Sequence, residues 1–327
     1  MRKIYIVVAL IISAFILNAC NKDTDIFVPD PGQVTGPDST WYSPVTALMP
    51  VNDLQQSLQL APDLDTIEAG NNADTINSAS GLQCIFPPNS CVDSNGAVVN
   101  GKVYVQSFLL KNRGAFISMG LPTVSNGNLL VSGGVFSVKL QNGISNIELA
   151  ANSFLKIGYS DSLFSKQMKL FNGVITDDQP FNWVPSPDSD NSILADNNGY
   201  AITTNSLQWI NCDYFYDDTT NANKTSVSIK LPSNLTNANT LAYIVFKDIR
   251  SVMNMNGDVA TKQFISSKVP VGLYATIVTI SKDGNFYYLG QQPITTTAAI
   301  SGANSQLLTI TPVRYSLDDI KLYLSSL

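Results

Sequence analysis

Two cysteines flank a short proline-containing segment: Cys84 and Cys91 bracket the residues IFPPNS. In the stretch LQCIF, the alternation of a strand places Leu82, Cys84 and Phe86 on one face. A bend at Pro87-Pro88 could return Cys91 to that face. If the protein is exported, a disulfide can form here, and it would stabilise the fold by about 2 kcal/mol or somewhat more. The alternative is a pair of small buried thiols, because a bridge needs Cα atoms within about 7 Å. The sequence leaves both open.

Other residue types that act as nucleophiles, bases or metal ligands are scarce. The chain contains no histidine, which removes the commonest general base and the commonest metal ligand. Cys212 has no basic residue near it in the sequence that would lower its pKa. Its neighbours Trp209 and Phe215 indicate a core strand rather than a reactive thiol.

Carboxylates are the remaining candidates for chemistry. Oxygen ligands for calcium gather in one turn-rich stretch, but their spacing fits no known calcium loop, and Asp and Asn are ordinary turn residues. The adjacent pairs Asp177-Asp178, Asp217-Asp218 and Asp318-Asp319 are poor hydrolytic pairs, because neighbours on a strand face opposite sides. The sequence therefore predicts no catalytic residue, no metal site and no cofactor. The calcium candidates are Asp177, Asp178, Asp188, Asp190, Asn191 and Asp196.

Two aromatic clusters near predicted turns, at residues 214–216 and 286–288, are candidates for ligand binding. Tyr214, Tyr216 and Tyr287 could stack their faces on sugar rings. Because successive strand residues face opposite sides of a sheet, at least half of the clustered rings are expected to face a core.

The composition limits the class of protein. The chain has 327 residues, of which 44% are hydrophobic and 13% charged, and its formal net charge is -6. The hydrophobic content is sufficient for a real core and argues against global disorder. The negative charge argues against a nucleic-acid partner, which needs a concentrated basic face.

Turn signals and short apolar runs dominate the rest of the chain. Seven Asn-Gly steps and one Asp-Gly step suit tight hairpin turns. Between them lie runs such as VYVQSFLL, LAYIVFKD and YATIVTIS, which are rich in β-branched and aromatic residues. Helical patterns are limited to a weak one at Asp53–Leu60 and a C-terminal one, where Ser316 can cap the first free N–H groups. The sequence therefore predicts an all-β protein of two β-sandwich domains with immunoglobulin-like architecture and a short C-terminal helix.

The expected order of domains follows the positions of the turn- and loop-forming residues. Residues 20–44, rich in Pro and Gly, read as a tether, and the strand-poor stretch 176–198 reads as a linker. The first sandwich is expected over residues 45–175 and the second, with the C-terminal helix, over residues 199–327.

The N-terminus carries an export pattern. Arg2 and Lys3 precede the apolar run Ile4–Leu17, which is too short to span a bilayer and has the proportions of a signal-peptide core. Residues Leu17–Cys20 resemble a bacterial lipobox. The resemblance implies a signal peptide over residues 1–19, and diacylglycerol with further acyl chains such as palmitate on Cys20. Residues 21–25, NKDTD, resemble the export signal of Bacteroidetes-type surface lipoproteins. We expect a lipid-anchored protein of the outer membrane, exposed at the cell surface.

Further motifs resemble a β-sandwich lipoprotein family of Bacteroidetes-type bacteria. Its signature reads apolar-Pro-x-Asn-x-x-x-Asp, then Gly, then Gly-x-Val, and the later strand reads Trp-Ile-Asn-Cys-Asp-x-Phe. The first half is also distantly similar to the β-sandwich module of netrin receptors, ankyrins and zonula-occludens proteins. The family implies a surface or periplasmic β-protein and no reaction. The matching segments are Phe86–Asp93, Gly96, Gly101–Val103, Gly120–Pro122, Gly127, Ser132–Phe136 and Trp209–Phe215.

The sequence thus favours a non-catalytic, membrane-anchored envelope lipoprotein that binds or scaffolds an unknown protein or glycan. A glycan-capture accessory of a surface nutrient-uptake system is the alternative. A secreted hydrolase using Asp residues is a third hypothesis, which the absence of histidine disfavours.

Overall fold

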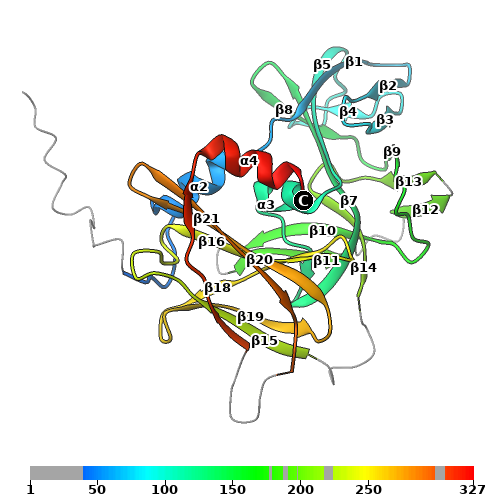
Figure 1. Ribbon diagram of the computed structural model, residues 1–327. Helices are drawn as coiled ribbons and strands as arrows, with labels where there is room; N and C mark the ends of the chain where they lie inside the picture. The colour runs from blue at the N-terminus through cyan, green and yellow to red at the C-terminus, as the bar shows by residue number, and fades with distance from the viewer. Residues whose placement is uncertain (1–39, 177–178, 187–190, 197, 217–223, 299–305) are drawn as a thin grey trace, which may run out of the picture. The chain divides into compact units, whose positions relative to one another are not determined.

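Strands dominate the part of the chain that the structure describes (Figure 1). The computed structural model describes residues 40–176, 179–186, 191–196, 198–216, 224–298 and 306–327. The predicted all-β class with a short C-terminal helix is confirmed. That helix, α4 (Leu317–Ser325), starts at the predicted cap, where Ser316 Oγ accepts a hydrogen bond from the backbone N–H of Asp319 at 3.0 Å.

Two sheets from the first two thirds of the chain face each other across one core. Buried side chains from both sheets, such as Val103, Phe136 and Cys212 from one and Cys84 and Ile157 from the other, belong to a single apolar cluster. This pair is the first sandwich. Its nine-stranded sheet has the order β1 (Asp63–Ala69), β5 (Gly101–Leu110), β7 (Asn128–Asn142), β14 (Ile210–Phe215), β10 (Lys169–Thr176) and β11 (Gln179–Pro185), with β4 (Cys91–Val92), β6 (Val124–Ser125) and β8 (Ser145–Leu149) beside this path. Its five-stranded sheet has the order β12 (Ser192–Asp196), β13 (Gly199–Thr204), β9 (Leu155–Ser160), β3 (Gln83–Phe86) and β2 (Asp74–Asn77).

Two further sheets form the second sandwich around a second core. Val227, Phe264, Ile244 and Ile277 belong to that cluster and come from both sheets. The four-stranded sheet has the order β18 (Asn256–Asp258), β19 (Gln263–Pro270), β15 (Lys224–Lys230) and β22 (Gln306–Thr309). The five-stranded sheet has the order β17 (Val252–Asn254), β16 (Thr240–Phe246), β20 (Tyr274–Asp283), β21 (Phe286–Thr295) and β23 (Val313–Tyr315).

A third apolar cluster joins the two sandwiches. It combines side chains of the nine-stranded sheet, such as Val135 and Trp183, with Val278 and Ile280 of β20 and with three helices. The helices are α2 (Pro50–Leu58), α3 (Arg113–Met119) and α4, which lie beside one another (Figure 1). Because both sandwiches contribute to this cluster, neither can be removed without exposing apolar surface of the other.

The sheet pairing differs from the expected domain boundary. The predicted linker, residues 176–198, contains β11 and β12, and β13 and β14 pair with β9, β7 and β10 of the first sandwich. The chain therefore passes to the second sandwich after Phe215. The Asn- and Asp-rich stretch between residues 176 and 198 therefore connects strands within one sandwich rather than linking two sandwiches.

The end of the predicted tether packs on the second sandwich. The ring of Trp41 lies 5.1 Å from that of Phe264 between centroids. The backbone N–H of Tyr42 donates to Asn237 Oδ1 at 3.0 Å, and the Thr236 hydroxyl donates to the Thr40 carbonyl at 3.0 Å. Residues 40–42 are thus part of the folded body, whereas residues 20–39 lie outside the described residues.

The contact between α3 and α4 gives a first prediction. Gly114→Ala is expected to destabilise the fold by about 1–3 kcal/mol or more, although Ala is the better helix former. A Cβ at this position would lie 1.7 Å from the backbone oxygen of Leu324, so α4 would have to move. Denaturant unfolding measures the loss. Gly143→Ala is the control, because no atom lies within 4 Å of a Cβ there, although its φ of 60° adds some strain. A Gly114→Ala variant as stable as the wild type would contradict the prediction.

Candidate functional site

Two of the sequence motifs from opposite halves of the chain pair as neighbouring strands. β14 lies antiparallel to β7, with Cys212 opposite Gly134. The register shifts between Cys212 and Asp213, so that Asp213 lies opposite Ser132. Such a bulge bends the strand and redirects its side chains. The motif residues therefore form the centre of the nine-stranded sheet.

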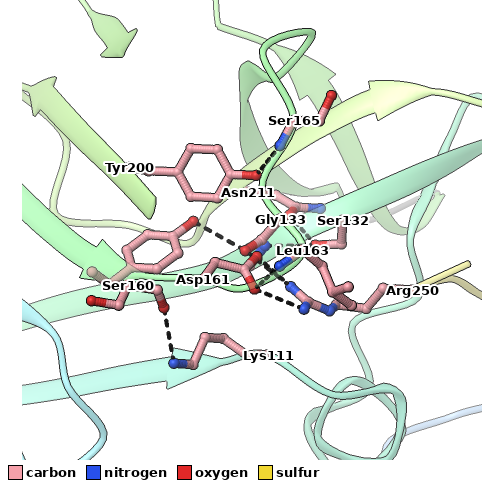
Figure 2. A network of polar contacts seen from close by, with 12 residues as sticks. Lys111, Ser132, Gly133, Ser160, Asp161, Leu163, Ser165, Tyr200, Asn211 and Arg250 are labelled. Carbon is pink, nitrogen blue, oxygen red and sulfur yellow. Dashed lines mark hydrogen bonds and ion pairs between the residues drawn. The ribbon is translucent and has the colours of Figure 1, made fainter. Parts of the chain in front are cut away.

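Polar side chains at this bulge bond to one another inside the protein, and Figure 2 shows Ser132 beside Asn211. The Ser132 hydroxyl donates to Asn211 Oδ1 at 3.0 Å and accepts from the backbone N–H of Gly134 at 3.1 Å. Asn211 Nδ2 donates to Asp213 Oδ2 at 2.6 Å. All three side chains are buried. Their mutual bonds replace most of those that water would have made, but the buried Asp213 Oδ1 has no hydrogen-bond partner among the described residues.

An ion pair between the two sandwiches lies next to the bulge (Figure 2). Arg250, from the turn between β16 and β17, donates to Asp161 Oδ2 at 2.7 Å and to Asp161 Oδ1 at 2.9 Å. It also donates to the Gly133 carbonyl at 3.2 Å, and Asp161 Oδ1 accepts from the backbone N–H of Leu163 at 3.1 Å. The two charged side chains are 10% and 3% exposed. A bidentate pair this well buried fixes the position of the Arg250 turn on the first sandwich.

The glycines of the Ser-Gly-Gly motif let two tyrosine rings approach the backbone. A Cβ on Gly133 would lie 2.9 Å from the Tyr200 hydroxyl, and a Cβ on Gly134, whose φ is 141°, would lie 3.0 Å from the Tyr159 hydroxyl. The Tyr159 hydroxyl donates to the Gly133 carbonyl at 3.4 Å, and the Tyr200 hydroxyl accepts from the backbone N–H of Ser165 at 2.8 Å. Glycine is therefore needed at both positions of the motif so that the tyrosine rings can pack against the backbone.

Burial changes the titration of this network without producing a reactive group. It raises the pKa of Asp213 to about 8, a shift that neighbouring hydrogen-bond donors and the charge of Arg250 oppose only in part. It also raises the pKa of Tyr200 to about 12 and raises the pKa of the Cys212 thiol. Asp213 is therefore a neutral acid at pH 7, and it is fully enclosed. The network holds two strands and two sandwiches together rather than facing a substrate.

The remaining described cysteines are free thiols. Cys84 and Cys91 are both buried and unbridged, so the structure shows the second of the two alternatives. Burial raises the pKa of both thiols, which makes them poor nucleophiles. Cys212 is a buried core residue, as the sequence indicates. Cys20, the expected lipid attachment site, lies outside the described residues.

The predicted aromatic candidates do not form one site. Tyr214, Tyr216 and Tyr287 are each half-buried, and each packs against a different apolar cluster: that of the first sandwich, that of the second, and that between them. Burial raises the pKa of Tyr214, and the Lys282 ammonium lies 6.0 Å from the ring centroid of Tyr287.

No cluster of metal-ligating side chains is found in the part of the chain that the structure describes. Asp318 and Asp319 lie in the first turn of α4, as the helix-start interpretation predicts. The side chain of Asn191 donates to the Ser186 hydroxyl at 3.0 Å. The other carboxylate candidates lie outside the description: Asp177, Asp178, Asp188, Asp190, Asp217, Asp218 and, for its side chain, Asp196.

A groove of about 560 Å³ lies between β7 and β10, next to the first residue of β14 in the nine-stranded sheet. β14 starts at Ile210, which pairs with Phe136 of β7 on one side and with Asn172 of β10 on the other. β14 does not extend before Ile210, and there the groove is lined by Ser137–Leu140 on β7 and by Gly173 and Ile175 on β10. The groove lies in the space that β14 occupies further along, and its volume is typical of ligand sites.

The groove presents aromatic, apolar and charged side chains together. Trp209 and Phe181 line it as half-buried rings, and Ile175 is 77% exposed. Lys139 and Glu148 contribute opposite charges from β7 and β8, and neither takes part in an ion pair found among the described residues. A site of this composition can orient a ligand through polar groups while it buries an apolar part.

Neither the groove nor the ion pair follows from the sequence. Trp209 was predicted to lie in a core strand. Its ring does pack against that of Phe108, with 5.4 Å between the ring centroids, but it also lines the groove. Arg250 carries no local signal. Its partner Asp161 is 89 positions away, and only the pairing of the sheets brings the two together.

Within the described residues no helix is both long and apolar enough to cross a membrane. Compared with known proteins, the chain matches no family model, and no curated protein matches it significantly.

Proposed function

We propose that this chain is a non-catalytic, lipid-anchored protein of the bacterial cell envelope that binds a partner through the groove beside Trp209. The observation that carries the binding role is the groove itself, where free charges and half-exposed rings meet on a sheet fixed by two packed sandwiches. The lipobox-like residues Leu17–Cys20 support the anchor, and the lipoprotein-family motifs support an exported β-protein.

The absence of a reaction is part of this proposal. Asp213, whose pKa burial raises to about 8, is enclosed. The described thiols have raised pKa values. A general acid or base must reach the proton that it transfers, and neither kind of group meets that condition here.

The anchor is tested by labelling. In a bacterium that processes lipoproteins, the full chain is expected to incorporate labelled fatty acid and to stay with the membrane fraction, because several acyl chains hold a protein almost permanently. Cys20→Ser is expected to lose the label and the membrane association, and Cys212→Ser is the matched control. An unlabelled wild-type chain would overturn the anchor.

A glycan is the second candidate ligand, favoured by the rings of Trp209 and Phe181 in the groove. A chain that serves a nutrient-uptake system would be retained on immobilised polysaccharides. A substitution that fills the groove would abolish that retention.

A further inference from the structure

We infer that the groove takes a short extended segment of a partner protein, which pairs its backbone with the free edge of β7. This inference rests on the proposed binding function and names the ligand class. The segment would add to the sheet as an extra strand in the line that β14 leaves empty.

The edge of β7 supplies the first argument. On one side, β7 pairs with β5 over residues 135–141. On the other side, it pairs with β14 up to Phe136 and with β8 from Leu140 onward. Among the described strands, residues 137–139 therefore have a partner on the β5 side and none on the groove side. An unpaired strand edge is a template for another chain, because its N–H and C=O groups are already aligned.

The width of the groove supplies the second argument. Neighbouring strands lie about 4.8 Å apart, so β7 and β10 are about 9.6 Å apart, which leaves room for one strand, where β14 lies between them. Gly173 N–H still donates to the Trp209 carbonyl at 2.9 Å, just before β14 starts. Beyond that bond, the walls of β7 and β10 both line the groove. The opening is therefore suited to one extended chain.

The side chains of the groove supply the third argument. A strand points alternate side chains to opposite faces, and the groove offers apolar contacts on both. On one face, Val138 belongs to the core of the first sandwich and Leu207 packs against it. On the other face, Trp209 and Phe181 pack against the cluster between the sandwiches. Lys139 and Glu148 would complement one negative and one positive charge of the segment. A free edge of three residues fits a chain end or a loop tip.

The test selects peptides against the full-length chain. A phage-displayed library of short random peptides is panned on the wild type, and retained peptides are synthesised. Lys139→Trp fills the groove and is expected to weaken binding about tenfold or more. Leu64→Trp is the matched control. Leu64 pairs with Gln106, which pairs with Lys139, so it is an exposed residue of the same row but outside the groove.

Backbone pairing has its own readout. N-methylation of single amides of a bound peptide is expected to weaken binding most at the alternate positions whose N–H groups face β7, because the other N–H groups point away from that strand. Equal tolerance at all positions would overturn strand pairing.

A polysaccharide panel separates the failures. One outcome is that the wild type retains a glycan, Lys139→Trp does not, and no peptide binds in a groove-dependent way. That outcome would overturn the peptide inference and keep the groove as the proposed binding site. If neither kind of ligand depends on the groove, both are overturned.

Discussion

Arg250→Met is expected to lower the free energy of unfolding by about 3–5 kcal/mol, because it leaves the carboxylate of Asp161 buried without its charge partner. The Asp161 side chain is 3% exposed and would keep the hydrogen bond from the Leu163 N–H. The lost guanidinium would also leave the Gly133 carbonyl with a weaker set of donors. Denaturant titration of the full chain measures the change.

The double variant Arg250→Met with Asp161→Leu is the control for this result. Replacing both charges with apolar side chains removes the unpaired carboxylate, so most of the lost stability is expected to return. A single variant as stable as the wild type would mean that water reaches Asp161. A double variant no better than the single one would assign the loss to packing of the Arg250 stem instead.

The position of the pair gives it a second role. The Arg250 carbonyl accepts from the Ser132 N–H at 3.0 Å, and the Ser251 hydroxyl donates to the Leu130 carbonyl. The turn between β16 and β17 is thus bonded to β7 by backbone, hydroxyl and charge together. Apolar contacts between sandwiches are tolerant of sliding, whereas these directional bonds select one arrangement.

Local patterns were sufficient to predict the class of fold. Alternation in segments such as VYVQSFLL predicted strands, and the burial of β5 alternates accordingly over Val103, Val105 and Ser107. Ser316 predicted the start of α4 because a helix cap is a local interaction. Both predictions needed only residues that are neighbours in the chain.

Pairing between distant segments could not be predicted in this way. The bond between Ser132 and Asn211 spans 79 positions, and nothing local states that their strands are neighbours. The domain boundary was misplaced for the same reason, because β13 and β14 pair with strands of the first sandwich although a turn-rich stretch precedes them. The groove depends on where β14 leaves the sheet before Ile210, which is also a property of the pairing.

The aromatic candidates illustrate the limit for surface sites. Strand alternation predicted that half of the rings would face a core, and all three candidates are in fact half-buried. Trp209 reaches the groove because it lies one residue before β14 begins, where the chain is no longer held by a partner on both sides. The residues next to Trp209 in the sequence would be the same whether its ring lay in a core or in a groove.

The second large effect concerns Asp213 and pH. Burial raises its pKa to about 8 in the fold, against 3.8 for an exposed aspartate. Between these values the folded state holds a proton that the unfolded state has released, so stability falls as pH rises from about 4 to about 8. Since each pKa unit is worth about 1.4 kcal/mol, the whole fall is about 4–6 kcal/mol. The chain has no histidine, so few other side chains titrate between pH 5 and 8.

Asp213→Asn is therefore expected to remove this fall and to be more stable than the wild type at pH 8 and above. The amide does not titrate, and its oxygen can still accept from Asn211 Nδ2. Unfolding free energies measured across pH 5–9 test this. Asp258→Asn is the matched control: hydrogen bonds from Thr261 and Ala260 lower the pKa of Asp258, so its contribution is lost at acid pH and its removal leaves the neutral slope in place. A wild-type profile that is flat from pH 5 to 8 would show that Asp213 is already ionised in the fold, and that water or a cation reaches the bulge between β7 and β14.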